Sequence, residues 1–263
     1  SVESKVRIAL SRGAVASVLI PWTVGEDEHA WARLQRAYAF DSLGPASSVP
    51  SHLAILIRPQ LARSLFEDAL FDFDQVVSME RRRVLSSFHL TVSLRFEGDS
   101  RVRAFRASNV IGLIEGTGRR QAKEYVVGSE HYDHLGHGPA VDGDSIYNGV
   151  IDNAIGSAGL LELARAVMEL PERPRRSIML LFTTAEEEGN LGEMFSLNPP
   201  PVPLSTMVAN INIDGLAGLD RFTDIVGIGA ELSDLWRHLL RAARYRGLDV
   251  NRPTELAVGH EAF

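Results

Sequence analysis

The chain has 263 residues, of which 45% are hydrophobic and 23% charged, a composition ordinary for a globular protein with one large domain or two smaller ones. Its 27 basic and 34 acidic residues give a formal charge of −7, and the basic residues are mostly scattered, so nucleic acid is not expected as a partner. No stretch approaches the roughly 20 apolar residues that cross a membrane, and the absence of cysteine excludes disulfide bonds and thiolate zinc sites.

The first part of the chain, up to about residue 88, alternates short apolar runs with loops. These runs predict short strands, and a proline-led stretch after them predicts one helix. The expected strands lie at residues 6–10, 14–22 and 53–59, and the expected helix lies near residues 59–71. This part holds no cluster of metal-binding or nucleophilic side chains, so we interpret residues 1–88 as a small β-rich accessory domain.

The start of the sequence carries no readable targeting signal. The chain begins at Ser1 rather than at a methionine, and its first ten residues lack the charged-then-apolar layout of a signal peptide. We expect that a targeting segment precedes Ser1 in the whole protein, and that the protein is extracytoplasmic or secreted.

From about His89 onward, longer apolar strands alternate with amphipathic helices. This alternation predicts a layered α/β domain, with three α-β-α layers around a mostly parallel, mixed central sheet. The expected strands lie at residues 88–96, 108–116, 123–131, 176–184 and 207–214, and the expected helices at residues 156–170 and 231–247. We assign this domain to residues 89–263.

Side chains that bind metals gather where these expected strands end. Functional groups in layered α/β domains collect beyond the carboxyl ends of the strands, so we expect these side chains to lie close together. The candidates are His131, Asp133 and His134 after one strand, Glu186, Glu187 and Glu188 after a second, Asp214 after a third, and Asp152 directly before a helix.

Histidine and carboxylate side chains bind zinc without thiolates when a site is catalytic. A centre with two metals that share a carboxylate needs about five ligands and a general base. Adjacent carboxylates repel one another where they are crowded, and a divalent cation offsets that repulsion. Because consecutive residues point in different directions, Glu186 and Glu187 can divide the roles of ligand and base. Glu188 is left over, and we expect it in solvent.

The order of these motifs resembles the di-zinc aminopeptidases of metallopeptidase family twenty-eight, whose relatives include glutaminyl cyclases and the transferrin receptor. The resemblance runs from about Asn109 to Gly229. Its motifs are EHYDHLG (130–136), DSIYNGVIDNAIGSAGLLELAR (144–165), PRRSIMLLFTTAEEEGNLG (174–192) and PPVPLSTMVANINIDG (200–215). Residues 5–22 in turn resemble the protease-associated domain that many family members carry, which implies that residues 1–88 form such a domain with its beginning missing.

The resemblance implies a ligand role for each of five residues. His131 and Asp214 would bind one zinc ion and Glu187 the second, while Asp152 would bridge the two ions. It also implies that the peptide bond after Asp152 is cis. The last ligand would be His260, although the usual Ser-Asp pair does not precede it and family members continue beyond this point. We therefore expect the domain at residues 89–263 to lack its C-terminal end.

The resemblance implies catalytic roles for two further residues. Asp133 would fix the His131 ring through its carboxylate. Glu186 would take a proton from a water that bridges the metals, the hydroxide would attack the scissile carbonyl, and Glu186 would then protonate the leaving amine. By contrast, we interpret His134 and His137 as loop groups, or as groups that contact a ligand, rather than as ligands themselves.

The leading hypothesis is therefore a zinc-dependent aminopeptidase with two zinc ions, acting on peptides with a free N-terminus. The alternatives are a glutaminyl-cyclase-like or carboxypeptidase activity on the same scaffold, or a binding homologue without catalysis. A non-catalytic relative typically has an eroded ligand set, whereas this sequence keeps its candidates. The preferred N-terminal residue and the oligomeric state stay open.

Overall fold

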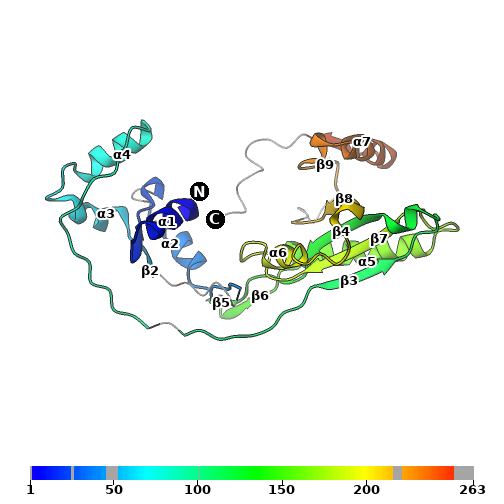
Figure 1. Cartoon of the computed structure of the whole chain (residues 1–263), viewed down its shortest axis with the longest axis horizontal. Helices are drawn as coiled ribbons and strands as arrows, with labels where there is room; N and C mark the ends of the chain where they lie inside the picture. The colour runs from blue at the N-terminus through cyan, green and yellow to red at the C-terminus, as the bar shows by residue number, and fades with distance from the viewer. Residues whose placement is uncertain (1, 25–26, 46–52, 100, 216–220, 252–263) are drawn as a thin grey trace. The chain divides into compact units, whose positions relative to one another are not determined.

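The computed structural model describes residues 2–24, 27–45, 53–99, 101–215 and 221–251 (Figure 1). It divides the chain into two compact units, one of residues 1–39 with 44–105 and one of residues 40–43 with 106–263. The second boundary between the two units thus falls after Phe105, whereas the sequence analysis placed the domain boundary after residue 88. We describe each unit by itself.

The segment before this division contains no helix or strand at residues 84–99 or 101–109. The strand expected at residues 88–96 is therefore not formed. Its apolar side chains are exposed, including Leu94 at 53% and Phe96 at 56%. A strand needs a neighbour to satisfy its backbone N–H and C=O groups, and no described strand pairs with this segment.

The first unit holds a small parallel sheet and several helices. Its elements are α1 (Val2–Ser11), β1 (Ala16–Leu19), η1 (Trp22–Val24), α2 (Glu28–Ala37), β2 (Leu53–Leu56), α3 (Pro59–Ala62), η3 (Arg63–Phe66) and α4 (Phe73–Arg81). The expected strand at residues 6–10 is part of α1, because an apolar run this short is compatible with either period. The unit is consequently richer in helix than the sequence predicts.

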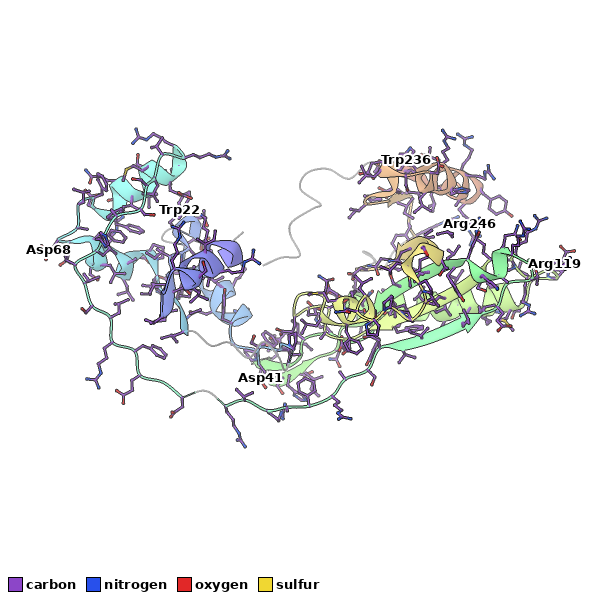
Figure 2. All side chains as sticks on the ribbon, viewed as in Figure 1. Trp22, Asp41, Asp68, Arg119, Trp236 and Arg246 are labelled. Atoms are coloured by element: carbon purple, nitrogen blue, oxygen red, sulfur yellow. The ribbon has the colours of Figure 1, made fainter. Side chains whose placement is uncertain are left out.

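The core of the first unit forms around Ala62, Phe66 and Phe73, which are at most 7% exposed. The rings of Phe66 and Phe73 lie 5.6 Å apart. Trp22, labelled in Figure 2, packs against this cluster. The Arg81 guanidinium lies 5.4 Å from the centroid of the Trp22 ring. These contacts bury the apolar faces of the short helices, which are too short to be stable alone.

The second unit is built on a four-stranded mixed sheet in the order β3-β7-β4-β8. The strands are β3 (Val110–Ile114), β4 (Tyr125–His131), β7 (Ser177–Thr183) and β8 (Met207–Asn212). β4 is parallel to both β7 and β8, and β3 is antiparallel to β7. The prediction of an α/β fold with a mostly parallel, mixed sheet is confirmed.

Helix α5 (Ile155–Met168) packs on β4 and β7 (Figure 1). Leu160 of this helix is fully buried, and a Cβ on Gly128 of β4 would lie 3.0 Å from its side chain. The missing Cβ of Gly128 therefore lets the helix approach the sheet closely. This contact positions the start of α5, which directly follows Asp152.

The remaining elements of the second unit surround this sheet. They are η4 (Gln121–Lys123), β5 (Gly136–Val141), β6 (Asp144–Tyr147), η5 (Val150–Ala154), α6 (Leu191–Ser196), η6 (Leu204–Thr206), β9 (Asp224–Val226), η7 (Ala230–Leu232), α7 (Leu235–Arg246) and β10 (Asp249–Asn251). β5 and β6 form an antiparallel hairpin, and the Phe40 ring packs edge-on against Tyr147 of β6 at 5.0 Å. Within the described ranges, no helix has both the length and the apolar character needed to cross a membrane.

Candidate metal centre

Three parallel strands bring the candidate residues to one edge of the sheet. His131 is the last residue of β4 and pairs in register with Thr183, the last residue of β7. Beyond β8, the Ile213 N–H donates to the Ser129 carbonyl at 3.0 Å, which continues the ladder and sets the next residue, Asp214, beside His131. The carboxyl ends of these strands therefore meet, as expected for parallel neighbours.

The first group of possible ligands contains His131, Asp152 and Asp214, whose ligand atoms all lie within 4.8 Å of one another. The His131 Nε2 atom lies 3.0 Å from Asp152 Oδ1 and 3.2 Å from Asp214 Oδ1. The His131 side chain is only 2% exposed. Its other nitrogen, Nδ1, donates to the Asp133 carbonyl at 2.7 Å, so Nε2 is the nitrogen that faces the carboxylates.

Asp133 thus fixes the His131 ring through its backbone carbonyl and not through its carboxylate, contrary to the sequence expectation. The Asp133 carboxylate instead accepts the Ala185 N–H at 2.8 and 3.0 Å, and it also accepts the Thr184 hydroxyl. Ala185 has a φ of 55°, in the left-handed region that is unfavourable for a residue with a Cβ. The Asp133 carboxylate therefore stabilises the turn that leads into the glutamates.

The second group contains His134, Asp152 and Glu187. The His134 Nδ1 atom contacts the Glu187 carboxylate and lies 4.0 Å from Asp152 Oδ2. This position is compatible with the sequence interpretation of His134 as a loop group or a group that contacts a ligand. The direction of the short loop after β4 decides where His134 points, and neither periodicity nor spacing encodes that direction.

Asp152 belongs to both groups, with Oδ1 toward His131 and Oδ2 on the side of His134. This is the arrangement expected of a carboxylate that bridges two cations. The peptide bond between Asp152 and Asn153 is cis, as the resemblance implies. Asn153 is 1% exposed, and its side-chain amide donates to the Ile213 carbonyl at 2.9 Å, which ties this loop to the residues after β8.

Residues 109–257 match the model of peptidase family M28, and this match covers more than half of the chain. The chain belongs to peptidase family M28. The match begins after the first unit, so the interpretation of residues 1–88 as a protease-associated-like domain stays a prediction. No curated protein sequence gives a significant match to the M28 chain.

Several solved structures are similar to the M28 chain. A leucine aminopeptidase precursor from Bacteroides thetaiotaomicron is 20% identical, with a TM-score of 0.44 and coverage of 56% of this chain and 58% of that one. A glutaminyl cyclase from the same organism, bound to N-acetylhistamine, is 20% identical, with a TM-score of 0.43 and 56% of each chain covered. BSAP, a zinc aminopeptidase from Bacillus subtilis, is 21% identical, with a TM-score of 0.44 and coverage of 56% and 34%. The M28 chain thus spans between 34% and 58% of the length of these chains.

Glu186 lies next to the two groups of the M28 chain and has the properties of a proton carrier. Its pKa is raised to about 7, mainly by burial and also by the negative charges of Asp214 and Glu187, against the opposing effect of His131. A carboxyl group with a pKa near neutrality can both accept and return a proton. Its neighbour Glu188 does not lie free in solvent, because it accepts the Leu43 N–H at 3.1 Å.

The charges at the centre fit a bound cation. Burial raises the pKa of Glu187, and the charge of Asp152 raises it further. For His131, burial opposes protonation, but the hydrogen bonds to Asp214 and to the Asp133 carbonyl outweigh this effect and raise the pKa to about 10. Protons thus offset the crowding of carboxylates in the metal-free chain, and a divalent metal ion would take over that role.

Two buried ligand atoms give a second test of fit. The buried His134 Nδ1 and Glu187 Oε1 atoms contact each other, and neither has a further hydrogen-bond partner among the described residues. A metal ion bound by Glu187 would take the place of this contact. The last predicted ligand, His260, lies outside the described residues, so its role stays a prediction.

Glu130 directly precedes His131 near the end of β4. It is fully buried on the face of β4 opposite to His131, since successive strand residues alternate. The Ser157 hydroxyl of α5 donates to its carboxylate at 2.8 Å, and burial raises the pKa of Glu130. Glu130 therefore links β4 to α5 behind the centre rather than joining the ligand groups.

Proposed function

We propose that this M28 family chain is the catalytic part of a zinc-dependent aminopeptidase that removes N-terminal residues from peptides. The observation that carries the proposal is the position of Asp152, which faces a histidine–carboxylate group on each side. Histidine nitrogen and carboxylate oxygen together are ligands typical of catalytic zinc.

The residues present would hold two zinc ions. His131, Asp152 and Asp214 would bind one ion, and Asp152 and Glu187 would bind the other with a histidine. When bound, zinc polarises the scissile carbonyl and lowers the pKa of water to near neutrality. The chain itself contributes the orientation of the ligands, because the Asp133 carbonyl holds the His131 ring and the Asn153 amide holds the loop of Asp152.

Glu186 would act as the general base. With a pKa of about 7 it can take the proton from the attacking water at neutral pH. It can then deliver that proton to the nitrogen of the leaving amine, which would otherwise depart as an unstable anion. No ligand role is needed for Glu186, because Glu187 provides the carboxylate of the second group.

The charges around the centre favour an aminopeptidase over a carboxypeptidase. A carboxypeptidase needs a cationic side chain for the C-terminal carboxylate of its substrate. In the described part of the chain, no lysine or arginine is ion-paired with Asp152, Glu186, Glu187 or Asp214.

The test is zinc quantification on the purified full-length protein, combined with a screen of aminoacyl chromogenic substrates. We expect zinc-dependent turnover of substrates with a free amino group and none of their N-acetylated counterparts. Cyclisation of N-terminal glutamine, or cleavage of N-blocked peptides from the C-terminus, would contradict the proposal. So would a zinc-loaded protein that turns over no substrate.

A further inference from the structure

We propose that the two loops preceding β4 and β7 form a docking surface for an anionic membrane surface, with the phosphate groups of lipids as the ligands. These loops comprise residues 115–124 and 171–176, and we call them the basic tip. They lie at the end of the four-stranded sheet opposite to the metal centre, and Figure 2 shows Arg119 at this end. The inference goes beyond the proposed function and does not depend on it.

The basic tip has a charge opposite to that of the chain as a whole. It contains six basic and three acidic residues, whereas the whole chain has a formal charge of −7. Arg176 is ion-paired with Glu124 at 2.7 Å, but the other five cations form no ion pair within the described part of the chain. These exposed cations are Arg119, Arg120, Lys123, Arg173 and Arg175. A concentration of positive charge on an acidic protein attracts an anionic partner.

The backbone holds the two loops of the basic tip together. The Thr117 N–H donates to the Pro174 carbonyl at 3.0 Å, and the Gly118 N–H donates to the Arg175 carbonyl at 3.1 Å. An added Cβ on Gly116 would lie 2.4 Å from the Arg175 carbonyl oxygen, so the two backbones are in direct contact. The cationic side chains of both loops therefore extend from one braced surface, which lowers the entropy cost of binding.

A cavity of about 540 Å³ opens beside the segment that joins α5 to β7, and it favours lipid over other anions. Arg173 and Arg175 line this cavity together with Met168 and Leu170, which are 59% and 47% exposed. Glu172 is the acidic residue in the lining. Exposed apolar side chains beside cations match the boundary between lipid headgroups and acyl chains. A free phosphate ion or a nucleic acid backbone offers no counterpart to the apolar part.

The number of cations is sufficient for reversible binding. Each basic side chain near an anionic membrane surface increases the partition coefficient by roughly fivefold. The five unpaired cations would together increase it by a factor on the order of 10³, and the unpaired carboxylates of Glu115 and Glu172 would oppose them. Because this attraction is screened by salt, the membrane-bound fraction should fall as the salt concentration rises.

Docking through the basic tip would leave the metal centre accessible. β4 pairs in register with β7 from Tyr125 and Ser177 at the basic tip to His131 and Thr183 at the metal centre. A strand of this length separates the two ends by roughly 20 Å. The carboxylates of the centre would thus lie beyond the Debye length of about 10 Å, so the anionic surface would not repel them. The docked protein could act on peptides dissolved in the surrounding water.

The experiment is co-sedimentation of the full-length protein with two kinds of vesicle, one of phosphatidylcholine alone and one of phosphatidylcholine mixed with phosphatidylglycerol. We expect binding to the anionic vesicles only. The triple variant Arg119→Gln/Arg173→Gln/Arg175→Gln should bind them roughly 100-fold more weakly. The single variants Arg119→Gln and Arg173→Gln should each bind roughly fivefold more weakly, so the test does not depend on whether the triple variant folds.

The matched control is a triple variant with the same change in charge, in which Arg7, Arg12 and Arg237 become glutamine. These arginines are exposed and lie outside the basic tip, so the control should bind anionic vesicles like the wild type. Leu170→Ser tests the apolar part of the cavity, and it should weaken binding while leaving the salt dependence unchanged. Circular dichroism checks that each variant is folded.

Several results would overturn the inference. Equal binding to both kinds of vesicle, or binding to neither, would show that the basic tip does not recognise anionic lipid. An equal loss in the matched control would show that binding follows the net charge of the chain. Thermal stabilisation by inorganic phosphate, or binding to DNA, without binding to vesicles would assign the basic tip to another anion. None of these results would affect the proposed function, which is tested by zinc content and turnover.

Discussion

His131 contacts Asp133 through a backbone carbonyl, at 2.7 Å from Nδ1, and this leaves the Asp133 carboxylate free for the Thr184–Ala185 turn. We predict that Asp133→Ala keeps the His131 tautomer, because the carbonyl is unchanged, but loosens the turn before the glutamates. The expected cost is roughly a 10–100-fold loss in kcat/KM. Nitrogen NMR of the His131 ring and steady-state kinetics measure the two effects, and a changed tautomer would contradict this assignment.

For the proposed base, we predict that Glu186→Gln leaves the zinc content unchanged and lowers kcat by roughly 10²–10⁴-fold. The reason is that the amide cannot take a proton, while no ligand is lost. Glu188→Gln is the matched control, because Glu188 lies two residues away and accepts only the Leu43 N–H among its described contacts. Zinc analysis and kinetics on both variants check the prediction, and comparable turnover in Glu186→Gln would remove the base assignment.

The stability of the metal-free chain should fall as the pH rises. The pKa of His131 is about 10 in the folded chain, against an ordinary value of 6.5. Its stabilising contribution is therefore fully present below pH 6.5 and is lost as the pH rises from 6.5 to about 10. Glu186 has a folded pKa of about 7 against 4.5, so its burial becomes steadily more costly as the pH rises through this window. Zinc needs the deprotonated ligands, so its stabilising effect should grow in the same direction.

Thermal unfolding with a chelator and with zinc, at about pH 5 to 9, measures both trends. As the pH rises, the Tm of the metal-free chain should decline, and the increase in Tm caused by zinc should become larger. Glu186→Gln should reduce the decline between about pH 5 and 7 only. A metal-free Tm that rises across this range would show that these groups are not shifted as described.

Gly149→Ala tests the close packing of the loops. Gly149 has a φ of 61°, and the added Cβ would meet His134 and the Asp152 carbonyl, so we predict loss of zinc from the second position. Gly143→Ala is the matched control, because it has a φ of 89° but no atom within 4 Å of an added Cβ. Both variants should lose about 1 kcal/mol or more from backbone strain. Only Gly149→Ala should lose zinc, and equal zinc contents would contradict the prediction.

Ser157→Ala tests the role of the buried Glu130. The Ser157 hydroxyl donates the hydrogen bond that the structure gives to the Glu130 carboxylate, whose other oxygen is unpartnered among the described residues. We predict a loss of about 1–3 kcal/mol in the free energy of unfolding, with zinc content unchanged. Ser87→Ala, at an exposed position in a segment without helix or strand, should change stability little. Denaturant unfolding of both variants measures the difference, and equal effects would argue against a buried link between β4 and α5.

The sequence predicts much of the centre because parallel strands end at one edge. The apolar runs before His131, Thr184 and Asp214 indicate where three strands end. Because these strands are parallel neighbours, their carboxyl ends meet at one edge of the sheet regardless of the conformation of the loops. Loop directions are different, because they depend on contacts between distant residues. The position of His134 depends on Gly149 and on the Asp133 bonds to the Thr184–Ala185 turn, and no local pattern carries that information.

The expected strand at residues 88–96 is a second case in which a local pattern did not predict the structure. Its alternating apolar residues have the right period, but period alone does not supply a pairing partner. Likewise, the run at residues 6–10 is short enough to satisfy a helix or a strand, and it lies within α1. Both errors concern segments outside the family match at residues 109–257.

The most direct test of the shared metal centre is a crystal structure of the zinc-loaded protein with anomalous diffraction measured at the zinc edge. The account predicts two zinc peaks, one beside His131 and Asp214 and one beside Glu187, with the Asp152 carboxylate in contact with both. A single peak, or two peaks that do not share Asp152, would contradict it.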